Sequence, residues 1–441
     1  MASILIRFCV LLLLAQQTIS AQHTFEGTFS PAKDYRWALL YNQKTDGQLA
    51  FIAEGNISSG KAEIIMPKDA PVGTYRVVYG IPEDKNYFEI LYNGKENISC
   101  SFSPKGLLFT ESNENKMIGD YFSEMYTLEN NLINFYKSGS TNSSQLKDLT
   151  LKLKEVQIKY EKESEGLMAN NFIKSNHPYI PASDENALSY IVNAKDHYFD
   201  YLDLNNPIIQ GSNFLNDKLF NYVFTSLPPK RLSQEQVEKV RKENVTVLNG
   251  HMNNVDEDFK LFFFYVLWKK ASDNALNSLA DYIYTKYLKV LAVAQKKEGL
   301  VDLVEQYNIL RIGATAPAIV GDEKSKNLAD LSGADRYVLV FWSSHCPHCL
   351  EQIPVLHESL SNETNVKVFA VGLEPNSETW KKEVTKLKGF EHSLAIGELQ
   401  SKTAVTYQVK RTPTYFILDA EKKSLFKPQN LEEVLDYLKV N

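Results

Sequence analysis

Cysteine is scarce in this chain of 441 residues, which contains four: Cys9, Cys100, Cys346 and Cys349. Secreted domains that rely on several disulfides for stability carry many more, so a disulfide-stapled scaffold is excluded. Cys346 and Cys349 are the one close pair. A single Cys-x-x-Cys sequence in a large protein points to redox chemistry instead.

Basic clusters and long apolar runs are also missing. The net charge is −6 and no run of lysine or arginine stands out, which disfavours nucleic-acid binding and a polybasic membrane patch. A membrane-spanning helix needs about 20 apolar residues, and no stretch of the chain reaches that length. The mature protein is therefore expected not to span a membrane.

The N-terminus has the pattern of a secretory signal peptide. Arg7 precedes a short apolar core at residues 8–15, and a polar stretch then ends in the small residues Ser20 and Ala21. The alternative, a membrane anchor, would need a longer apolar core. We expect residues 1–21 to be removed together with Cys9, and the mature protein to be exported to the periplasm or cell envelope.

Residues 22–112 alternate apolar and polar side chains between turn residues, which predicts an antiparallel β-sandwich. Asn93-Gly94 lies between two such runs and predicts a hairpin. Cys100 shares a strand face with Ile98 and Phe102. It is interpreted as a small buried core residue, with a reactive or intermolecular thiol as the alternative.

Residues 113–308 have a helical pattern and are expected to form a separate helical domain. Residues 259–268 are apolar nearly all round, which predicts a buried helix. The three histidines of this region, His177, His197 and His251, lack metal-ligand spacing. They are interpreted as surface or satisfied residues.

Residues 309–441 alternate strand and helix patterns, which predicts a central sheet covered by helices. Strands are expected at residues 337–342, 366–373, 414–418 and 424–426, and helices at residues 350–360, 378–388 and 431–440. The complete chain is thus expected to be a multidomain α+β protein.

The segment expected to carry the redox chemistry is Cys346-Pro347-His348-Cys349, which follows the apolar strand at residues 337–342. Three-residue spacing places both sulfurs on one side of a helical turn, close enough to form a disulfide. Free N–H groups at the helix start favour the Cys346 thiolate. At pH 7 a thiol of pKa about 8.5 is only about 3% ionised, whereas one of pKa about 6 is about 90% ionised.

These features predict that Cys346 attacks a disulfide and that Cys349 resolves the mixed disulfide. His348 lies between them and is expected to add a positive charge or a donor that stabilises the reduced form. A stabilised reduced form makes the pair more oxidising.

Further motifs follow the same segment. Ile312 begins an Ile-Gly-Ala-Thr-Ala-Pro sequence, Phe341-Trp342 precedes the cysteines, Pro354 follows them by five residues, and Arg411-Thr412-Pro413-Thr414 comes later. With these motifs, residues 309–441 resemble the TlpA/ResA branch of the thioredoxin family, a group of exported disulfide reductases. The complete architecture is loosely similar to exported thioredoxin-like proteins with a β-rich N-terminal domain.

The resemblance implies a cis Thr412–Pro413 bond that faces the sulfurs and offers backbone groups to an extended substrate. It also places Glu374 near a position where the family carries an active-site glutamate. Glu374 is therefore a candidate base, with a surface carboxylate as the alternative. The chain departs from the pattern at His345, where tryptophan is common, and at Val340, where thioredoxin has a buried acid.

The resemblance further implies a membrane electron donor of the DsbD-like type. Substrates would be disulfides of extracytoplasmic proteins, with apocytochromes in cytochrome c maturation as one possibility. No cofactor is expected besides the redox-active disulfide Cys346–Cys349, and no metal is expected.

Other readings stay open at this point. The same fold could act as a disulfide-forming oxidant, and the β-rich and helical regions could form a partner-binding body. A different class of reading is a copper or zinc module built from His345, Cys346, His348 and Cys349. Four ligands within five residues fit a tetrahedral site poorly.

Overall fold

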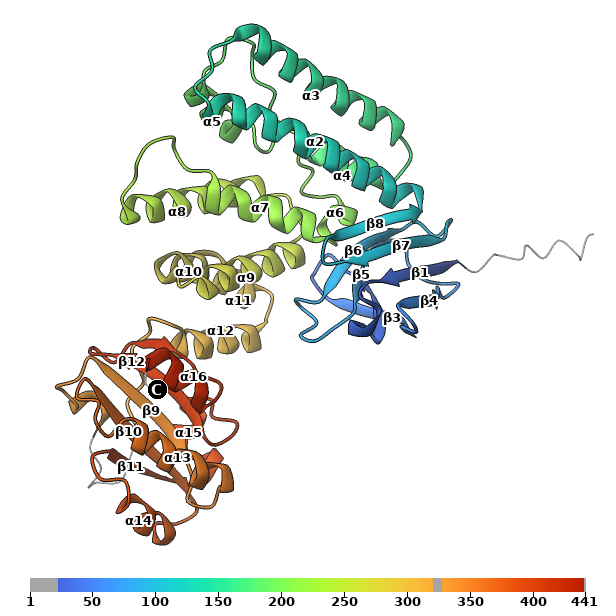
Figure 1. The fold of residues 1–441 in the computed structure, drawn as a ribbon. Coiled ribbons are helices and arrows are strands. Elements are labelled where there is room, and N and C mark those ends of the chain that lie inside the picture. The colour runs from blue at the N-terminus through green and yellow to red at the C-terminus, as the bar shows by residue number, and fades with distance from the viewer. Residues whose placement is uncertain (1–22, 320–326, 440–441) are drawn as a thin grey trace, which may run out of the picture. The chain divides into compact units, whose positions relative to one another are not determined.

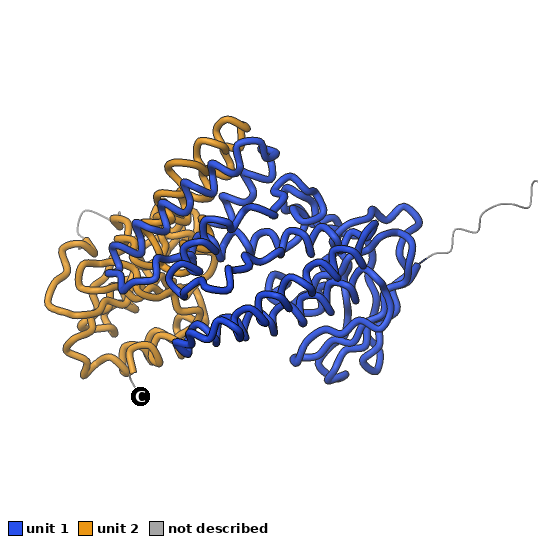
Figure 2. Tube along the Cα trace, turned by 90° about the horizontal axis from the view of Figure 1, so that it is seen from above, with its two compact units in different colours: residues 1–267 blue, residues 268–441 orange. Residues whose placement is uncertain are grey.

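The computed structural model describes residues 23–319 and 327–439. The chain divides into two compact units, residues 1–267 and residues 268–441 (Figure 2). The expected signal peptide at residues 1–21, with Cys9, lies outside the described residues. The expected domain boundaries after residues 112 and 308 remain predictions.

Two four-stranded sheets begin the first unit, in the orders β4-β1-β7-β8 and β3-β2-β5-β6 (Figure 1). Phe25 and Ile98 from one sheet and Leu40 and Tyr75 from the other enter one hydrophobic core. The strands are β1 (Thr24–Phe29), β2 (Trp37–Gln43), β3 (Leu49–Asn56), β4 (Lys61–Ile65), β5 (Gly73–Val78), β6 (Tyr87–Tyr92), β7 (Ile98–Ser103) and β8 (Gly106–Glu111).

Two expectations for this region are wrong. The pairing is not purely antiparallel, because β1 runs parallel to β7 with Phe25 opposite Ile98. Asn93-Gly94 does not close a hairpin, because β6 and β7 belong to different sheets. Gly94 does have the positive φ of a turn residue, 69°. The turn was therefore recognised, but a local turn signal does not determine which strands pair.

Cys100 on β7 is 3% exposed and lies in the shared core. Burial raises the pKa of its thiol to about 12, so the thiol stays protonated near neutral pH. This confirms the interpretation as a small buried core residue and argues against a reactive thiol.

Helices form the rest of the first unit, and the two longest, α2 and α3, pack side by side (Figure 1). The buried carboxylate of Glu114 on α2 accepts the backbone N–H groups of Met168 and Ala169 at the start of α4. The helices are α2 (Asn113–Lys137), α3 (Ser143–Glu163), α4 (Ala169–Ser175), α5 (Ala187–Asp196), α6 (Pro207–Gln210), α7 (Asn213–Thr225), α8 (Gln234–His251) and α9 (Glu257–Asp273), which continues into the second unit.

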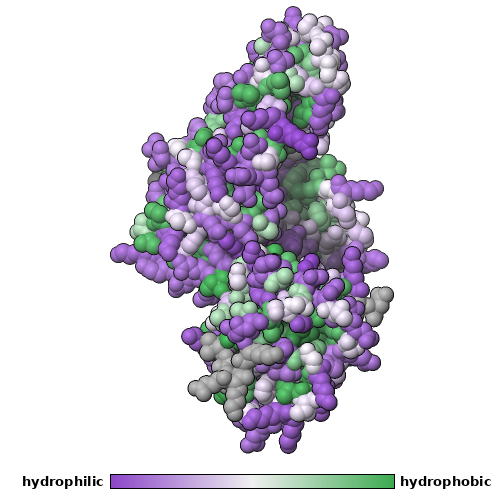
Figure 3. Space-filling model, turned by 90° about the vertical axis from the view of Figure 1, so that its left-hand side faces the viewer, coloured by the Kyte–Doolittle hydropathy of each residue, from purple (hydrophilic) through white to green (hydrophobic). Residues whose placement is uncertain are grey.

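The helix α9 contains the apolar segment at residues 259–268. Phe259, Phe263, Phe264 and Trp268 are all fully buried, which confirms the expectation of a buried helix. No helix within residues 23–319 and 327–439 is long and apolar enough to cross a membrane. On the face seen in Figure 3, hydrophilic and hydrophobic side chains are interspersed.

The second unit continues with short helices and ends in a mixed sheet of order β11-β10-β9-β12-β13. β9, β10 and β11 run parallel, and β12 is antiparallel to β9. The elements are α10 (Asn277–Ile283), the π-helix η2 (Tyr284–Leu288), α11 (Lys289–Ala294), α12 (Glu298–Leu310), β9 (Arg336–Trp342), α13 (Pro347–Ser359), β10 (Val366–Glu374), α14 (Glu378–Val384), β11 (Glu391–Ile396), α15 (Lys402–Thr406), β12 (Thr414–Asp419), β13 (Ser424–Phe426) and α16 (Leu431–Leu438).

The central strand β9 is buried on both faces. Tyr337, Leu339 and Phe341 enter one hydrophobic cluster, which also contains Ala404 of α15. The alternate residues, including Trp342, enter a second cluster with side chains of α13 and α16. The expectation of a central sheet covered by helices is therefore confirmed, while β11 and α15 were not anticipated.

Candidate active site

Cys346 lies between the end of β9 and the start of α13, where it is the N-cap residue with an extended backbone. Pro347 occupies the first turn, where its missing N–H leaves no hydrogen bond unmade. The backbone N–H of Cys349 donates to the Sγ atom of Cys346 at 3.3 Å. A free N–H group of the helix start is thus directed at the sulfur.

The loop before β12 approaches Cys346 from another part of the sequence. The Thr412–Pro413 peptide bond is cis. The Cys346 thiol donates to the backbone carbonyl oxygen of Thr412 at 3.4 Å. The sequence motif at residues 411–414 and the cysteine motif therefore meet in one site.

The two thiols differ sharply in acidity. Partial burial raises the pKa of Cys346. Hydrogen bonds with the side chains of Cys349 and Thr412 and from the backbone N–H groups of Cys349 and His348 outweigh the burial, so the net pKa is lowered. Cys349 is fully buried. Burial, with the hydrogen bond to Cys346, raises its pKa to about 12. Of these two thiols, Cys346 is therefore the more acidic and the better nucleophile.

Glu374 at the end of β10 is fully buried, which excludes the alternative of a surface carboxylate. Its carboxylate accepts the Ser344 backbone N–H at 2.5 Å and the Ser344 hydroxyl at 3.0 Å. The Ser343 hydroxyl donates to it at 3.4 Å, and the Nδ1 atom of His345 lies 2.9 Å away. One buried carboxylate thus binds the whole turn that leads into Cys346.

His348 lies in the first turn of α13. Its side chain is 79% exposed, and its nearest charged contact is Glu351 at 3.9 Å. The residue influences Cys346 through its backbone N–H, which lowers the pKa of the Cys346 thiol. A charge on an exposed imidazole is screened by solvent, so its effect on the dithiol is small.

A comparison with known families gives a match to the family described as "Thioredoxin-like" over residues 334–424. Residues 334–424 form a thioredoxin-like domain. No curated protein matches the chain.

Several solved structures are similar to part of this chain. A domain of a possible thiol-disulfide isomerase from Cytophaga hutchinsonii is 25% identical, with coverage of 29% of this chain and 90% of that one and a TM-score of 0.26. The thioredoxin domain of a thiol-disulfide oxidoreductase from Bacteroides vulgatus is 24% identical, with coverages of 30% and 98% and a TM-score of 0.26. A thioredoxin-like protein from Bacteroides caccae is 18% identical, with coverages of 59% and 96% and a TM-score of 0.36.

Sequence reasoning missed Ser343, Ser344 and the contact between His345 and Glu374. A signal for this cluster was present, because β9 and β10 were both expected as strands of one central sheet. The carboxyl ends of parallel neighbours lie at the same edge of a sheet. Ser343 directly follows β9 and Glu374 ends β10, so their proximity could have been inferred.

The histidines of the helical region, with His357 and His392, have their own partners. His177 and His251 stack on tyrosine or phenylalanine rings, and His197 contacts Asp200 at 2.7 Å. His357 and His392 contact backbone carbonyl oxygens. Among residues 23–319 and 327–439, no group of three or more histidine, cysteine or acidic side chains could hold a metal ion.

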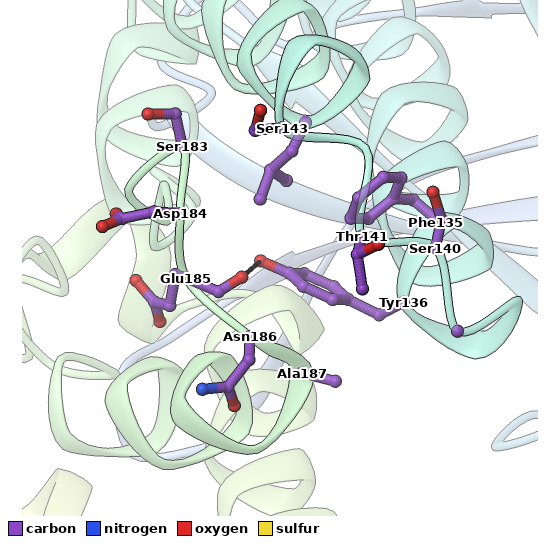
Figure 4. A pocket seen from close by; sticks show the side chains of 12 residues that line it. Phe135, Tyr136, Ser140, Thr141, Ser143, Ser183, Asp184, Glu185, Asn186 and Ala187 are labelled. Carbon is purple, nitrogen blue, oxygen red and sulfur yellow. Dashed lines mark hydrogen bonds between the residues drawn. The ribbon is translucent and has the colours of Figure 1, made fainter.

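The helical region has a cavity of about 250 Å³ between the end of α2, the start of α3 and the segment before α5 (Figure 4). The Tyr136 hydroxyl donates across it to the backbone carbonyl of Glu185 at 3.2 Å. The Glu185 carboxylate is already bound by Tyr179 and Asn193. The described residues that line this cavity include no cysteine, histidine or lysine, and it offers no redox chemistry.

Proposed function

We propose that this protein is an exported thiol–disulfide oxidoreductase that reduces disulfides in extracytoplasmic proteins. One observation carries the proposal: Cys346 is an N-cap thiol of lowered pKa, and a buried thiol of raised pKa, Cys349, lies one helical turn further on. This asymmetry is what a nucleophile and a resolving thiol require. We also infer that the two N-terminal sheets form a β-sandwich, because they share one core.

The reaction follows from the asymmetry. The Cys346 thiolate attacks one sulfur of the substrate disulfide, so that a mixed disulfide forms and one substrate thiolate leaves. Cys349 then loses its proton and attacks the Sγ atom of Cys346. This step forms the Cys346–Cys349 disulfide, releases the second substrate thiol and completes the transfer of two electrons to the substrate.

Reduction is the favoured direction, with oxidation of substrate thiols by the Cys346–Cys349 disulfide as the alternative. The main argument for an oxidant was His348 between the cysteines. Its imidazole is exposed, which weakens that argument. We expect the midpoint potential of the pair to lie nearer to about −270 mV, as in thioredoxin-type reductants, than to about −120 mV, as in strong oxidants. A redox titration against glutathione decides between them.

A reductase outside the cytoplasm needs a supply of electrons. The resemblance to the TlpA/ResA branch supports a membrane dithiol donor of the DsbD-like type, which would reduce the Cys346–Cys349 disulfide after each turnover. Pro413 and Thr412 would present backbone groups to the substrate segment, and Glu374 is proposed to hold the turn before Cys346. Apocytochromes are one candidate substrate.

Insulin reduction with dithiothreitol as electron source tests the assignment. We expect Cys346→Ser to abolish turnover, because no nucleophile remains, and Cys349→Ser to accumulate mixed disulfides with substrate. Cys100→Ala is the matched control and should retain turnover, since Cys100 lies in a separate core. An active Cys346→Ser chain together with a Cys349→Ser chain that traps nothing would refute the assigned roles.

A further inference from the structure

A second cavity, of about 210 Å³, lies directly beside the cis-proline loop of the thioredoxin-like domain. Arg411, Pro413 and Thr414 form one wall, and residues 427–429, between β13 and α16, form another. The guanidinium of Arg411 donates to the backbone carbonyl of Gln429 at 3.1 Å. The two loops are therefore joined across the cavity.

The charge in this cavity has one sign. Arg411 and Lys427 line it, and no aspartate or glutamate is present among the described lining residues. Glu433 is nearby in sequence, but its carboxylate already accepts the Gln429 backbone N–H at 2.8 Å, and it does not line the cavity.

Lys427 is a half-buried cation with no counter-ion among residues 23–319 and 327–439. Within the described parts of the chain its ammonium group has no hydrogen bond or ion pair, and its one aromatic contact is the Phe416 ring at 6.0 Å. Burial lowers the pKa of Lys427, which reflects the cost of holding an unpaired charge away from water. A carboxylate in the cavity would remove that cost.

The loop that lines the cavity also contacts Cys346. Thr412, between the lining residues Arg411 and Pro413, has its carbonyl oxygen 3.4 Å from the Sγ atom of Cys346. An extended chain advances about 3.3–3.6 Å per residue. A side chain that enters the cavity would therefore belong to a residue about one to three positions from the substrate cysteine.

We propose that this cavity is a substrate subsite that binds the carboxylate of an aspartate or glutamate located within about three residues of the target disulfide. Arg411 and Lys427 supply the charged donors. The inference rests on the proposed thiol–disulfide exchange at Cys346 and adds a substrate class to it: protein disulfides flanked by acidic residues.

The test compares disulfide-linked peptides that differ only by glutamate or glutamine at positions one to three from the cysteine. Both ends are blocked, so that a terminal carboxylate cannot substitute for the side chain. With the full mature chain, we expect kcat/KM for the best glutamate peptide to exceed that of its glutamine counterpart by about tenfold. Lys427→Met should bring the ratio close to one.

Lys410→Gln is the matched control, because Lys410 is exposed, adjacent to Arg411 and absent from the cavity lining. It removes the same charge and should leave the ratio unchanged. If the Lys427→Met chain fails to fold, the ratio of the two kcat/KM values is measured for Arg411→Gln instead, since Arg411 is exposed. This substitution should also lower the ratio. Equal rates for both peptides with the unaltered chain, or a ratio that survives loss of Lys427, would overturn the subsite.

A competition experiment separates failure of the subsite from failure of the proposed function. The Cys349→Ser chain is mixed with equal amounts of both peptides. Mass spectrometry then quantifies the mixed disulfide that Cys346 forms with each peptide. An excess of the glutamate adduct supports the subsite, whereas equal adducts overturn it but leave the exchange chemistry intact. Absence of any adduct refutes the proposed function and the subsite with it.

Discussion

At the scale of single residues, the site depends on a partly buried thiol, Cys346, and a fully buried carboxylate, Glu374. Cys346 combines partial burial with hydrogen bonds that favour its thiolate. Glu374 has no exposed surface, and its oxygens are occupied by the residues of one turn. The function of each side chain depends on the hydrogen-bond donors that surround it in the folded chain. Neither the residue type nor its position in the sequence determines how many donors these are.

The first prediction concerns the acidity of Cys346. Because its pKa is lowered, alkylation by iodoacetamide should reach half its maximal rate below the pH of about 8.5 that is typical of free cysteine. The same lowered pKa stabilises the reduced folded chain above the pKa of the unfolded thiol, and this contribution is lost as pH falls through the folded pKa. A midpoint at or above that of free cysteine would contradict the prediction. Mass spectrometry identifies the labelled residue.

The second prediction concerns Glu374→Gln. The amide keeps the volume but replaces one acceptor oxygen by a donor, so the turn at Ser344 should be destabilised by about 1–3 kcal/mol. Hydrogen exchange of the Ser344 amide measures the effect locally. Glu351→Gln is the matched control: its side chain is 78% exposed, and we expect a change within about 0.5 kcal/mol. Equal effects of the two substitutions would exclude the positioning role.

At the scale of elements, burial patterns were a better guide than local turns. The apolar run of β9 predicted a strand buried on both faces, because a parallel strand between helices excludes water from each side. The turn at Asn93-Gly94 predicted a hairpin, yet β6 and β7 pair with strands of different sheets. Turn chemistry depends on a few residues, whereas strand pairing depends on which surfaces the complete sheets bury.

The third prediction concerns β7, which lies between β1 and β8 and carries Cys100 in the shared core. Cys100→Ser buries a hydroxyl group without a partner and should cost about 1–3 kcal/mol of folding free energy. Cys100→Ala removes the sulfur without adding a polar group and should be milder. Urea unfolding of the two variants makes the comparison. Rapid reaction of Cys100 with Ellman's reagent in the folded chain would contradict its assignment to the core.

At the scale of the whole molecule, the chain consists of two compact units, and the cysteine site is built from the second. The residues that hydrogen-bond to Cys346 and Glu374, namely Ser343, Ser344, His345, Cys349 and Thr412, all belong to residues 268–441. We therefore expect the exchange chemistry to be retained by the second unit.

The fourth prediction follows from this separation. A fragment of residues 268–441 should reduce a small disulfide such as a blocked cystine peptide within about threefold of the full chain's kcat/KM, since all groups that tune the thiols are retained. Insulin reduction by the fragment and by the full chain is measured in parallel, as the comparison with a protein substrate. A fragment that is folded by circular dichroism but lacks activity toward the small disulfide would show that the first unit contributes to the chemistry itself.

The sequence alone determined the dithiol, the helix start that activates it and the strand that leads into it, because these depend on neighbours within one turn or one strand. It also indicated the β-rich, helical and α/β regions by their periodicities. Only the tertiary structure decided that Glu374 is buried against Ser344 and His345, that the exposed His348 acts through its backbone, and that β6 and β7 separate. These outcomes depend on which segments, distant in the sequence, pack against one another and bury each other's side chains. The sequence pattern of one segment does not reveal its packing partners.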